Sequence, residues 1–225
     1  MAYILSLETA TKNCSVALSK DGELIQLIEF AEANFSHAEK LHVFIKDVLD
    51  QCGIGFDQLQ AIAVSQGPGS YTGLRIGVST AKGLCYALNL PLIAVNTLQA
   101  LAKQLSITEG YVIPMIDARR MEVFASVYNA EGTCIEDISA KIIDGNSFEN
   151  LGDAPIHLLG DGAMKCQELL NAPNFVYYPE LIYPSAREMV AIATAKFNAQ
   201  DFADVAYFEP FYLKDFVMTT SSKKK

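Results

Sequence analysis

Short apolar stretches alternate with amphipathic stretches along the chain, and their order repeats once. Apolar runs of about five residues are typical of buried strands, whereas apolar residues at every third or fourth position are typical of helices. In the first hundred residues the pattern predicts the order β-β-β-α-β-α-β-α. We expect strands at residues 3–7, 15–18, 23–30, 61–65 and 91–95, and helices at residues 37–52, 74–88 and 98–105.

Local turn and cap signals support this first half. Lys20-Asp21-Gly22 suits a hairpin turn between the second and third strands. Ser36 is placed to cap the first helix, with Glu39 three residues later to complete a capping box. Gly53 is placed to end that helix.

The second half repeats the order more loosely. We expect strands at residues 112–117, 122–128, 134–143 and 156–159, a helix that opens at Gly160-Asp161-Gly162 and runs to Leu170, and an amphipathic helix at 185–198. Both halves begin with a buried strand that ends in an acid, Glu8 in one and Asp117 in the other. The sequence therefore predicts an α/β protein of two packed lobes, residues 1–105 and 106–225, with the last segment packing back on the first lobe.

Charge and hydropathy restrict the partners. The 225-residue chain has 17 basic and 26 acidic side chains and a net charge of −9, so it should repel a phosphate backbone, and direct binding of tRNA by this chain alone is disfavoured. The basic run Lys223–Lys225 is interpreted as a solvated end.

No apolar run reaches the roughly 18–20 residues that cross a bilayer, and residues 1–8 have no signal-peptide pattern, so we expect a cytoplasmic protein without a membrane partner. The five cysteines are interpreted as reduced thiols.

A glycine-rich loop joins the strand at 61–65 to the second helix. The run Gly67 to Gly77 has no Gly-Lys-Ser/Thr ending, so it is not a P-loop. Gly73, Gly77 and Ala81 recur every four residues and form a stripe of small side chains that lets another backbone approach closely. Close helix packing is the favoured interpretation, and direct contact with a phosphate at the helix N-terminus is the alternative.

The ionisable residues give weaker indications. His37 and His42 are five residues apart on one helix and point away from each other, so we expect no histidine-based metal site and assign no metal ligand in this chain. The acids that end the two leading strands would either cap hairpin turns or hold a cofactor or Mg²⁺ across a cleft. The candidate cofactor-binding residues are Glu8, Thr11, Asp117 and Arg119, and no catalytic set such as Ser-His-Asp is readable.

These stretches together resemble the TsaB family across residues 4–213. The resemblance rests above all on the run Gly67 to Gly77 and its continuation Ala81-Lys82-Gly83-Leu84. Further matching stretches are 7–11, 14–18, 36–41, 117–123 and 209–213. It implies the two-lobed fold of the actin/Hsp70/sugar-kinase superfamily (ASKHA), with a duplicated β-β-β-α-β-α core.

The resemblance also implies a function. Members of this family pair with TsaD, the catalytic subunit that forms threonylcarbamoyladenosine beside the anticodon of tRNA, and the ATPase TsaE joins the complex. By resemblance, the contact with TsaD lies on the first two helices, and the same face forms homodimers when TsaD is missing. The residues that this assigns to the partner interface are Leu41, Phe44, Ile45, Val48, Gly73, Gly77 and Ala81.

Departures from the superfamily pattern favour a chain without chemistry of its own. The first phosphate loop of active members is Asp-x-Gly-Thr, whereas this chain has Glu8-Thr9-Ala10-Thr11, and a Cβ at Ala10 crowds a phosphate. We therefore expect a non-catalytic scaffold subunit that binds no cofactor tightly by itself, with ATP or ADP at most at the interface of the complex. The alternatives are an ATP-dependent enzyme or a metallopeptidase of the same fold, which ATP–Mg²⁺ calorimetry and metal analysis of the purified chain would detect.

Overall fold

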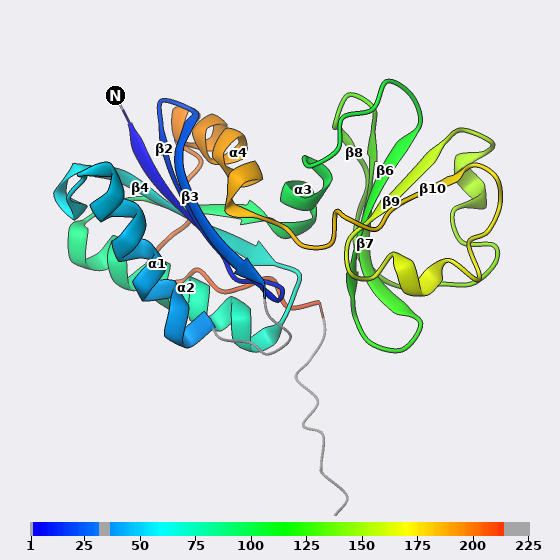
Figure 1. Cartoon of the computed structure of the whole chain (residues 1–225), viewed down its shortest axis with the longest axis horizontal. Coiled ribbons are helices and arrows are strands. Elements are labelled where there is room, and N and C mark those ends of the chain that lie inside the picture. The colour runs from blue at the N-terminus through cyan, green and yellow to red at the C-terminus, as the bar shows by residue number, and fades with distance from the viewer. Residues whose placement is uncertain (1, 32–36, 214–225) are drawn as a thin grey trace, which may run out of the picture.

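Two five-stranded mixed sheets lie side by side and form two lobes in the computed structural model, which describes residues 2–31 and 37–213 (Figure 1). The first sheet has the order β3-β2-β1-β4-β5 and the second the order β8-β7-β6-β9-β10. The first sheet is built from β1 (Tyr3–Glu8), β2 (Asn13–Lys20), β3 (Glu23–Ala31), β4 (Leu59–Gly67) and β5 (Leu92–Asn96). The second is built from β6 (Tyr111–Asp117), β7 (Glu122–Asn129), β8 (Cys134–Ile142), β9 (Ile156–Leu159) and β10 (Phe175–Tyr178).

The two halves share one strand order, so the predicted duplication and the two-lobed α/β fold are confirmed. In each half the first strand pairs antiparallel with the second and parallel with the fourth. The predicted hairpin turn after β2 is also confirmed, since Asp21 and Gly22 both have the positive φ that a tight hairpin needs. The hydrophobic pattern did not predict β10.

The helices cover the sheets unequally. The structure has α1 (His37–Cys52), α2 (Tyr71–Leu88), α3 (Thr97–Ala102) and α4 (Ala186–Asn198), with 3-10 turns at Phe56–Gln58, Glu149–Leu151 and Met164–Cys166. On the first sheet, α1 and α2 cover one face and α4 covers the other. On the second sheet, α3 covers one face and short turns cover the other. The last helix of each half thus packs against the sheet of the other half.

The helix predicted to open at Gly160 and run to Leu170 is wrong. The structure has a single 3-10 turn there, in which Cys166 N–H donates to the carbonyl of Ala163 at 3.0 Å. The chain before it is held by the sheet, because Gly162 N–H donates to the Met115 carbonyl at 3.0 Å. Few residues remain before Pro173, and a short helix cannot repay the cost of its nucleation.

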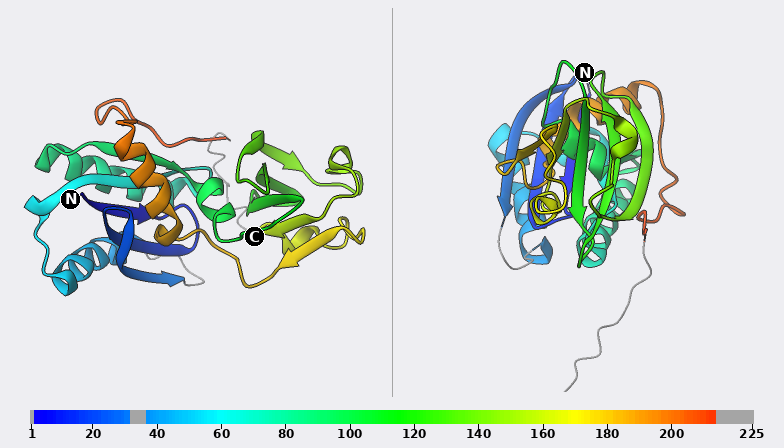
Figure 2. Two further views of the ribbon diagram at one scale, coloured as in Figure 1. Left: turned by 90° about the horizontal axis from the view of Figure 1, so that it is seen from above. Right: turned by 90° about the vertical axis from the view of Figure 1, so that its right-hand side faces the viewer.

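The last described residues return to the first lobe, as the segment coloured orange to red shows in Figure 2. Ala203 forms an isolated antiparallel bridge with Leu92 on β5. Lys82 on α2 donates to the carbonyls of Ala206 and Phe208 at 3.2 and 2.9 Å.

The predicted end of α1 agrees with the structure, because Gly53 follows the last residue of that helix with φ +64°. The predicted cap Ser36 lies outside the described residues. The basic run Lys223–Lys225 lies outside them as well.

Candidate functional site

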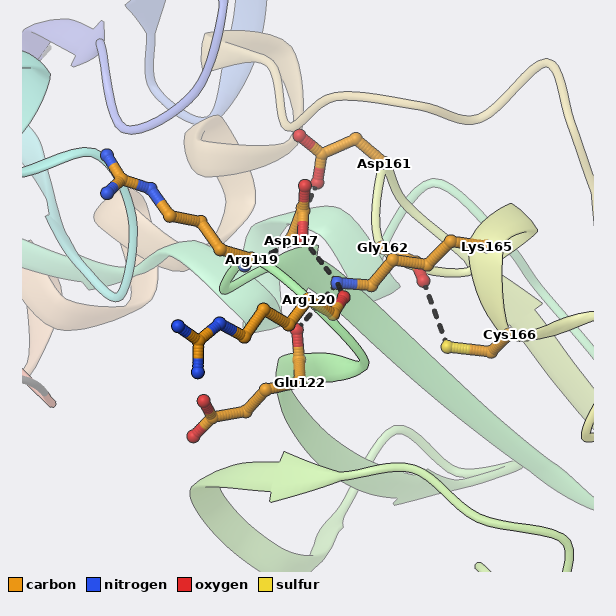
Figure 3. Close-up of polar contacts among 8 residues, drawn as sticks. All are labelled: Asp117, Arg119, Arg120, Glu122, Asp161, Gly162, Lys165 and Cys166. Carbon is orange, nitrogen blue, oxygen red and sulfur yellow. Dashed lines mark hydrogen bonds and ion pairs between the residues drawn. The ribbon is translucent and has the colours of Figure 1, made fainter. Parts of the chain in front are cut away.

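Four turns meet where the lobes adjoin, and they contain the acidic strand ends predicted from the sequence. The first lobe contributes the turn between β1 and β2 and the glycine loop before α2. The second contributes the turn between β6 and β7 and the loop after β9 (Figure 3). The two lobes interact here electrostatically, since the positive charge of Lys12 acts on the Asp161 carboxyl.

Glu8 lies at the end of β1 and is completely buried. Its Oε1 atom accepts hydrogen bonds from Ala10 N–H at 2.6 Å and from the Ser65 hydroxyl at 2.9 Å. Its Oε2 atom has no hydrogen-bond partner among the described residues. Burial raises the pKa of the Glu8 carboxyl to about 7, and these hydrogen bonds lower it only in part. This carboxyl therefore holds the turn and is out of reach of solvent.

The glycine loop packs on the neighbouring turn of the same lobe. Ser70 N–H donates to the Ala10 carbonyl at 2.7 Å, and the Ser70 hydroxyl accepts from Gly73 N–H at 3.3 Å as the cap of α2. A Cβ added at Gly73 would lie 2.1 Å from the Thr9 carbonyl oxygen, and one added at Gly77 would lie 2.2 Å from the Thr9 hydroxyl. The close-packing interpretation of the stripe is confirmed, with Thr9 as the neighbour. Contact with a phosphate at this loop stays a prediction.

This packing bears on the predicted partner interface, which stays a prediction. The stripe on α2 is buried inside the first lobe, and so are the apolar positions of α1, which form its core; only Phe44 is partly exposed. Residues that are buried in the isolated chain expose little side-chain area to a partner. The buried residues of the predicted set are Leu41, Ile45, Val48, Gly73, Gly77 and Ala81. The outward faces of the same helices carry Val43 and Tyr86, whose side chains are 52% and 87% exposed.

The second acid, Asp117, ends β6 and is tied into its own hairpin. Its Oδ1 atom accepts from Arg119 N–H at 2.8 Å and forms an ion pair with Lys165. The Lys165 ammonium also donates to the carbonyls of Arg120 and Glu122, each at 2.7 Å. A lysine cation thus contacts all three of these oxygens.

Asp161 joins this hairpin from the loop after β9. Its Oδ1 atom accepts from Asp117 N–H at 2.9 Å. Burial raises the pKa of the Asp161 carboxyl, and the hydrogen bond from Asp117 opposes that shift. The run Gly160-Asp161-Gly162 was only a weak indication of Asp161, and no sequence pattern pointed to Lys165.

The remaining candidates do not converge on one cavity. Thr11 is buried beside the first turn, and its carbonyl accepts from the buried ring of His37 at 2.7 Å. Arg119 is exposed in the other lobe. Within residues 2–31 and 37–213, no group of three or more His, Cys, Asp or Glu residues is placed to hold a metal ion. No helix in that part of the chain is long and apolar enough to cross a membrane.

Comparison of the sequence with those of known proteins identifies the family. Residues 31–208 match the family model described as "TsaD: tRNA N6-adenosine threonylcarbamoyltransferase". The tRNA threonylcarbamoyladenosine biosynthesis protein TsaB of Escherichia coli is 30% identical, with 94% of each chain covered. The chain belongs to the TsaB family. The resemblance predicted from the motifs is therefore confirmed.

Further members of the family agree in sequence and in structure. The Bacillus subtilis TsaB protein is 27% identical, with 94% of this chain and 93% of the relative covered. The solved structure of YeaZ from Pseudomonas aeruginosa superposes with a TM-score of 0.80 at 27% identity, over 95% of this chain and all of that one. The two-lobed fold described above is thus the fold of a TsaB relative along nearly its whole length.

Proposed function

We propose that this chain is the non-catalytic partner subunit of the complex that forms threonylcarbamoyladenosine in tRNA, and that it binds the catalytic subunit TsaD. The names of its relatives place them in the biosynthesis of this nucleoside. The observation that carries the proposal is the complete burial of Glu8, the acid that ends the first strand. A carboxyl without exposure, already bonded to Ala10 and Ser65, cannot contact a substrate unless the lobe opens.

The ion pair of Asp117, the second of the two acids, supports the same proposal. Asp117 is paired with Lys165, and that ammonium is bonded to two backbone carbonyls as well. Binding Mg²⁺ at this carboxylate would require the lysine to leave and would bring two like charges together. Both acidic strand ends therefore serve the structure of their own turns.

The docking surface for TsaD is the outward face of α1 and α2. These helices lie next to each other on one face of the first sheet, and their inward sides are filled by the core. Val43 is directed away from that core, and Tyr86 is the most exposed large apolar side chain among the described residues. Exposed aromatic and aliphatic side chains of this kind are typical anchors of protein interfaces.

The rest of the assembly belongs to the same proposal. TsaE joins the chain and TsaD in a larger complex, and tRNA is bound through that complex. ATP or ADP binds at the interface of the complex and not tightly to this chain alone. The lone chain forms homodimers through the helix face that TsaD would cover, and the complex works in the cytoplasm.

A paired substitution on the helix face tests the docking surface. Val43→Glu combined with Tyr86→Glu places two charges on exposed positions, so the fold should persist. Charges at the centre of an apolar contact should weaken the affinity for TsaD at least tenfold. Calorimetric titration of the purified chain with TsaD measures the dissociation constant. Gly77 is unsuitable for this purpose because it is buried against Thr9.

The matched control is Ile142→Glu on β8 in the second lobe. Ile142 is 73% exposed, so the substitution adds a charge at a similarly open apolar position away from α1 and α2. The control should bind TsaD as tightly as the unmodified chain. Equal affinities for the paired variant and the control would show that TsaD does not dock on this face.

A further inference from the structure

The turn between β6 and β7 presents two adjacent arginines that the proposed function leaves unexplained. Arg119 and Arg120 have φ angles of +71° and +53°, in the left-handed region that few side chains other than asparagine and glycine adopt readily. Backbone held in such a conformation outside glycine costs free energy and persists where the surroundings fix it, often at functional positions.

The surroundings fix this turn firmly. Ala118 N–H donates to the Glu122 carbonyl at 3.1 Å, and Glu122 N–H donates to the Arg119 carbonyl at 3.2 Å, which closes the turn. Lys165 holds the turn from behind through the carbonyls of Arg120 and Glu122. The backbone that carries the two arginines is therefore held in place before any ligand arrives.

The two guanidinium groups are free to bind. Both arginines are exposed, and no hydrogen bond or ion pair among the described residues engages either side chain. Figure 3 shows both side chains extending away from Lys165 and Asp161. In a structure whose other polar groups at this turn are bonded, two unpaired adjacent guanidinium groups indicate a site for an anion.

The charge around the turn favours the same ligand. Lys12, Arg119, Arg120 and Lys165 stand here against the carboxyl groups of Asp117, Asp161 and Glu122, in a chain with a net charge of −9. The turn is thus a local positive feature on an acidic molecule. None of the exposed large apolar side chains lies within residues 117–122, whereas a docking surface for a protein would need an apolar centre.

From this geometry we infer that Arg119 and Arg120 contact the phosphate backbone of tRNA when the chain is part of its complex. Phosphate contacts are polar and need no apolar surroundings, and the planar guanidinium group binds phosphate oxygens with two hydrogen bonds. Two contacts are too few for the acidic chain alone to retain RNA, so they act beside the contacts of the other subunits. The inference therefore rests on the proposed function.

Salt-dependent binding of tRNA to the assembled complex tests the inference. The variant is Arg119→Asn combined with Arg120→Asn, because asparagine tolerates left-handed backbone and removes the guanidinium group with its charge. Loss of two phosphate contacts should make the negative slope of log affinity against log salt shallower by about 1–2 and weaken binding about tenfold to hundredfold at 0.1 M salt. A matched control, Lys103→Ala combined with Arg187→Ala, removes two exposed positive charges elsewhere and should leave both quantities unchanged.

The outcomes separate this inference from the proposal on which it rests. An assembled variant complex that binds tRNA with unchanged affinity and unchanged slope overturns the inference alone. A variant that folds but no longer assembles with TsaD also overturns it, because the arginines would then face a protein. Failure of the unmodified chain to assemble with TsaD would instead contradict the proposed function.

Discussion

At the scale of single residues, burial decides what the acidic strand ends do. Glu8 and Asp117 occupy corresponding places in the two halves, at the ends of β1 and β6. Glu8 is enclosed, and burial raises its pKa to about 7, whereas Asp117 is partly exposed and paired with Lys165. The sequence placed these two acids at corresponding strand ends, and the structure shows that their surroundings differ.

The raised pKa of Glu8 predicts a specific pH dependence of stability. The folded protein keeps the proton up to about pH 7, whereas the unfolded chain releases it near 4.5, the ordinary pKa of a glutamate carboxyl. The unfolded state then binds fewer protons than the folded state, so the free energy of unfolding falls as pH rises from 4.5 to 7, by roughly 3 kcal/mol. Urea unfolding at a series of pH values measures this decline.

The Glu8→Gln variant isolates the contribution of this group. Glutamine has the same shape but does not titrate, so the variant should lack this part of the decline, and the difference between the two proteins should grow from pH 4.5 to 7. Identical pH profiles for both proteins would mean that Glu8 is not the titrating group.

At the scale of secondary-structure elements, α2 shows how a stripe of small residues is used. A stripe on a helix indicates that a backbone approaches closely, but it does not say which backbone. Here Thr9 of the adjoining turn fills the stripe at Gly73 and Gly77, and no room remains for a foreign helix. Most helices and strands were predictable from periodicity, because their apolar positions face one core.

Two glycines of α2 should respond oppositely to alanine. At Gly77 the added Cβ would lie 2.2 Å from the Thr9 hydroxyl, so Gly77→Ala should destabilise the chain by about 1–3 kcal/mol. At Gly83 no heavy atom lies within 4 Å of the added Cβ, so Gly83→Ala should stabilise it by about 0.5–1 kcal/mol through helix propensity alone. Thermal or urea unfolding of both variants gives the two signs. A stabilising Gly77→Ala would refute the close contact with Thr9.

Elements whose structure depends on distant partners were harder to predict. The segment after Gly162 has helical periodicity, since Cys166 and Leu170 are four apart and both buried. Lys165 is nevertheless bonded to the β6–β7 hairpin, and the segment forms only a 3-10 turn. The ammonium group of Lys165 binds carbonyls that lie more than forty residues earlier in the chain, and no local sequence pattern predicts such a contact.

At the scale of the whole molecule, the last helix of each half packs on the sheet of the other half and so joins the two lobes. The predicted duplication rested on the two leading strands with their terminal acids, and the common strand order confirms it. That α3 packs on the second sheet and α4 on the first could not be predicted, since an apolar helix face does not reveal which sheet it will cover. The site was predictable in part: the sequence indicated Asp117 and Arg119 but not their ties to Lys165 and Asp161.

The central claim is that the chain supplies a surface to its complex and no chemical group. The most direct measurement is the formation of threonylcarbamoyladenosine in tRNA by a reconstituted mixture of TsaD, TsaE and this chain, normalised to assembled complex, with the unmodified chain or with Glu8→Gln. We expect formation to require the chain, to be absent with the chain alone, and to agree within about twofold for the variant, a difference well below the loss caused by removing a catalytic group. Modification by the chain alone, or loss of activity in an intact complex that contains Glu8→Gln, would contradict the claim.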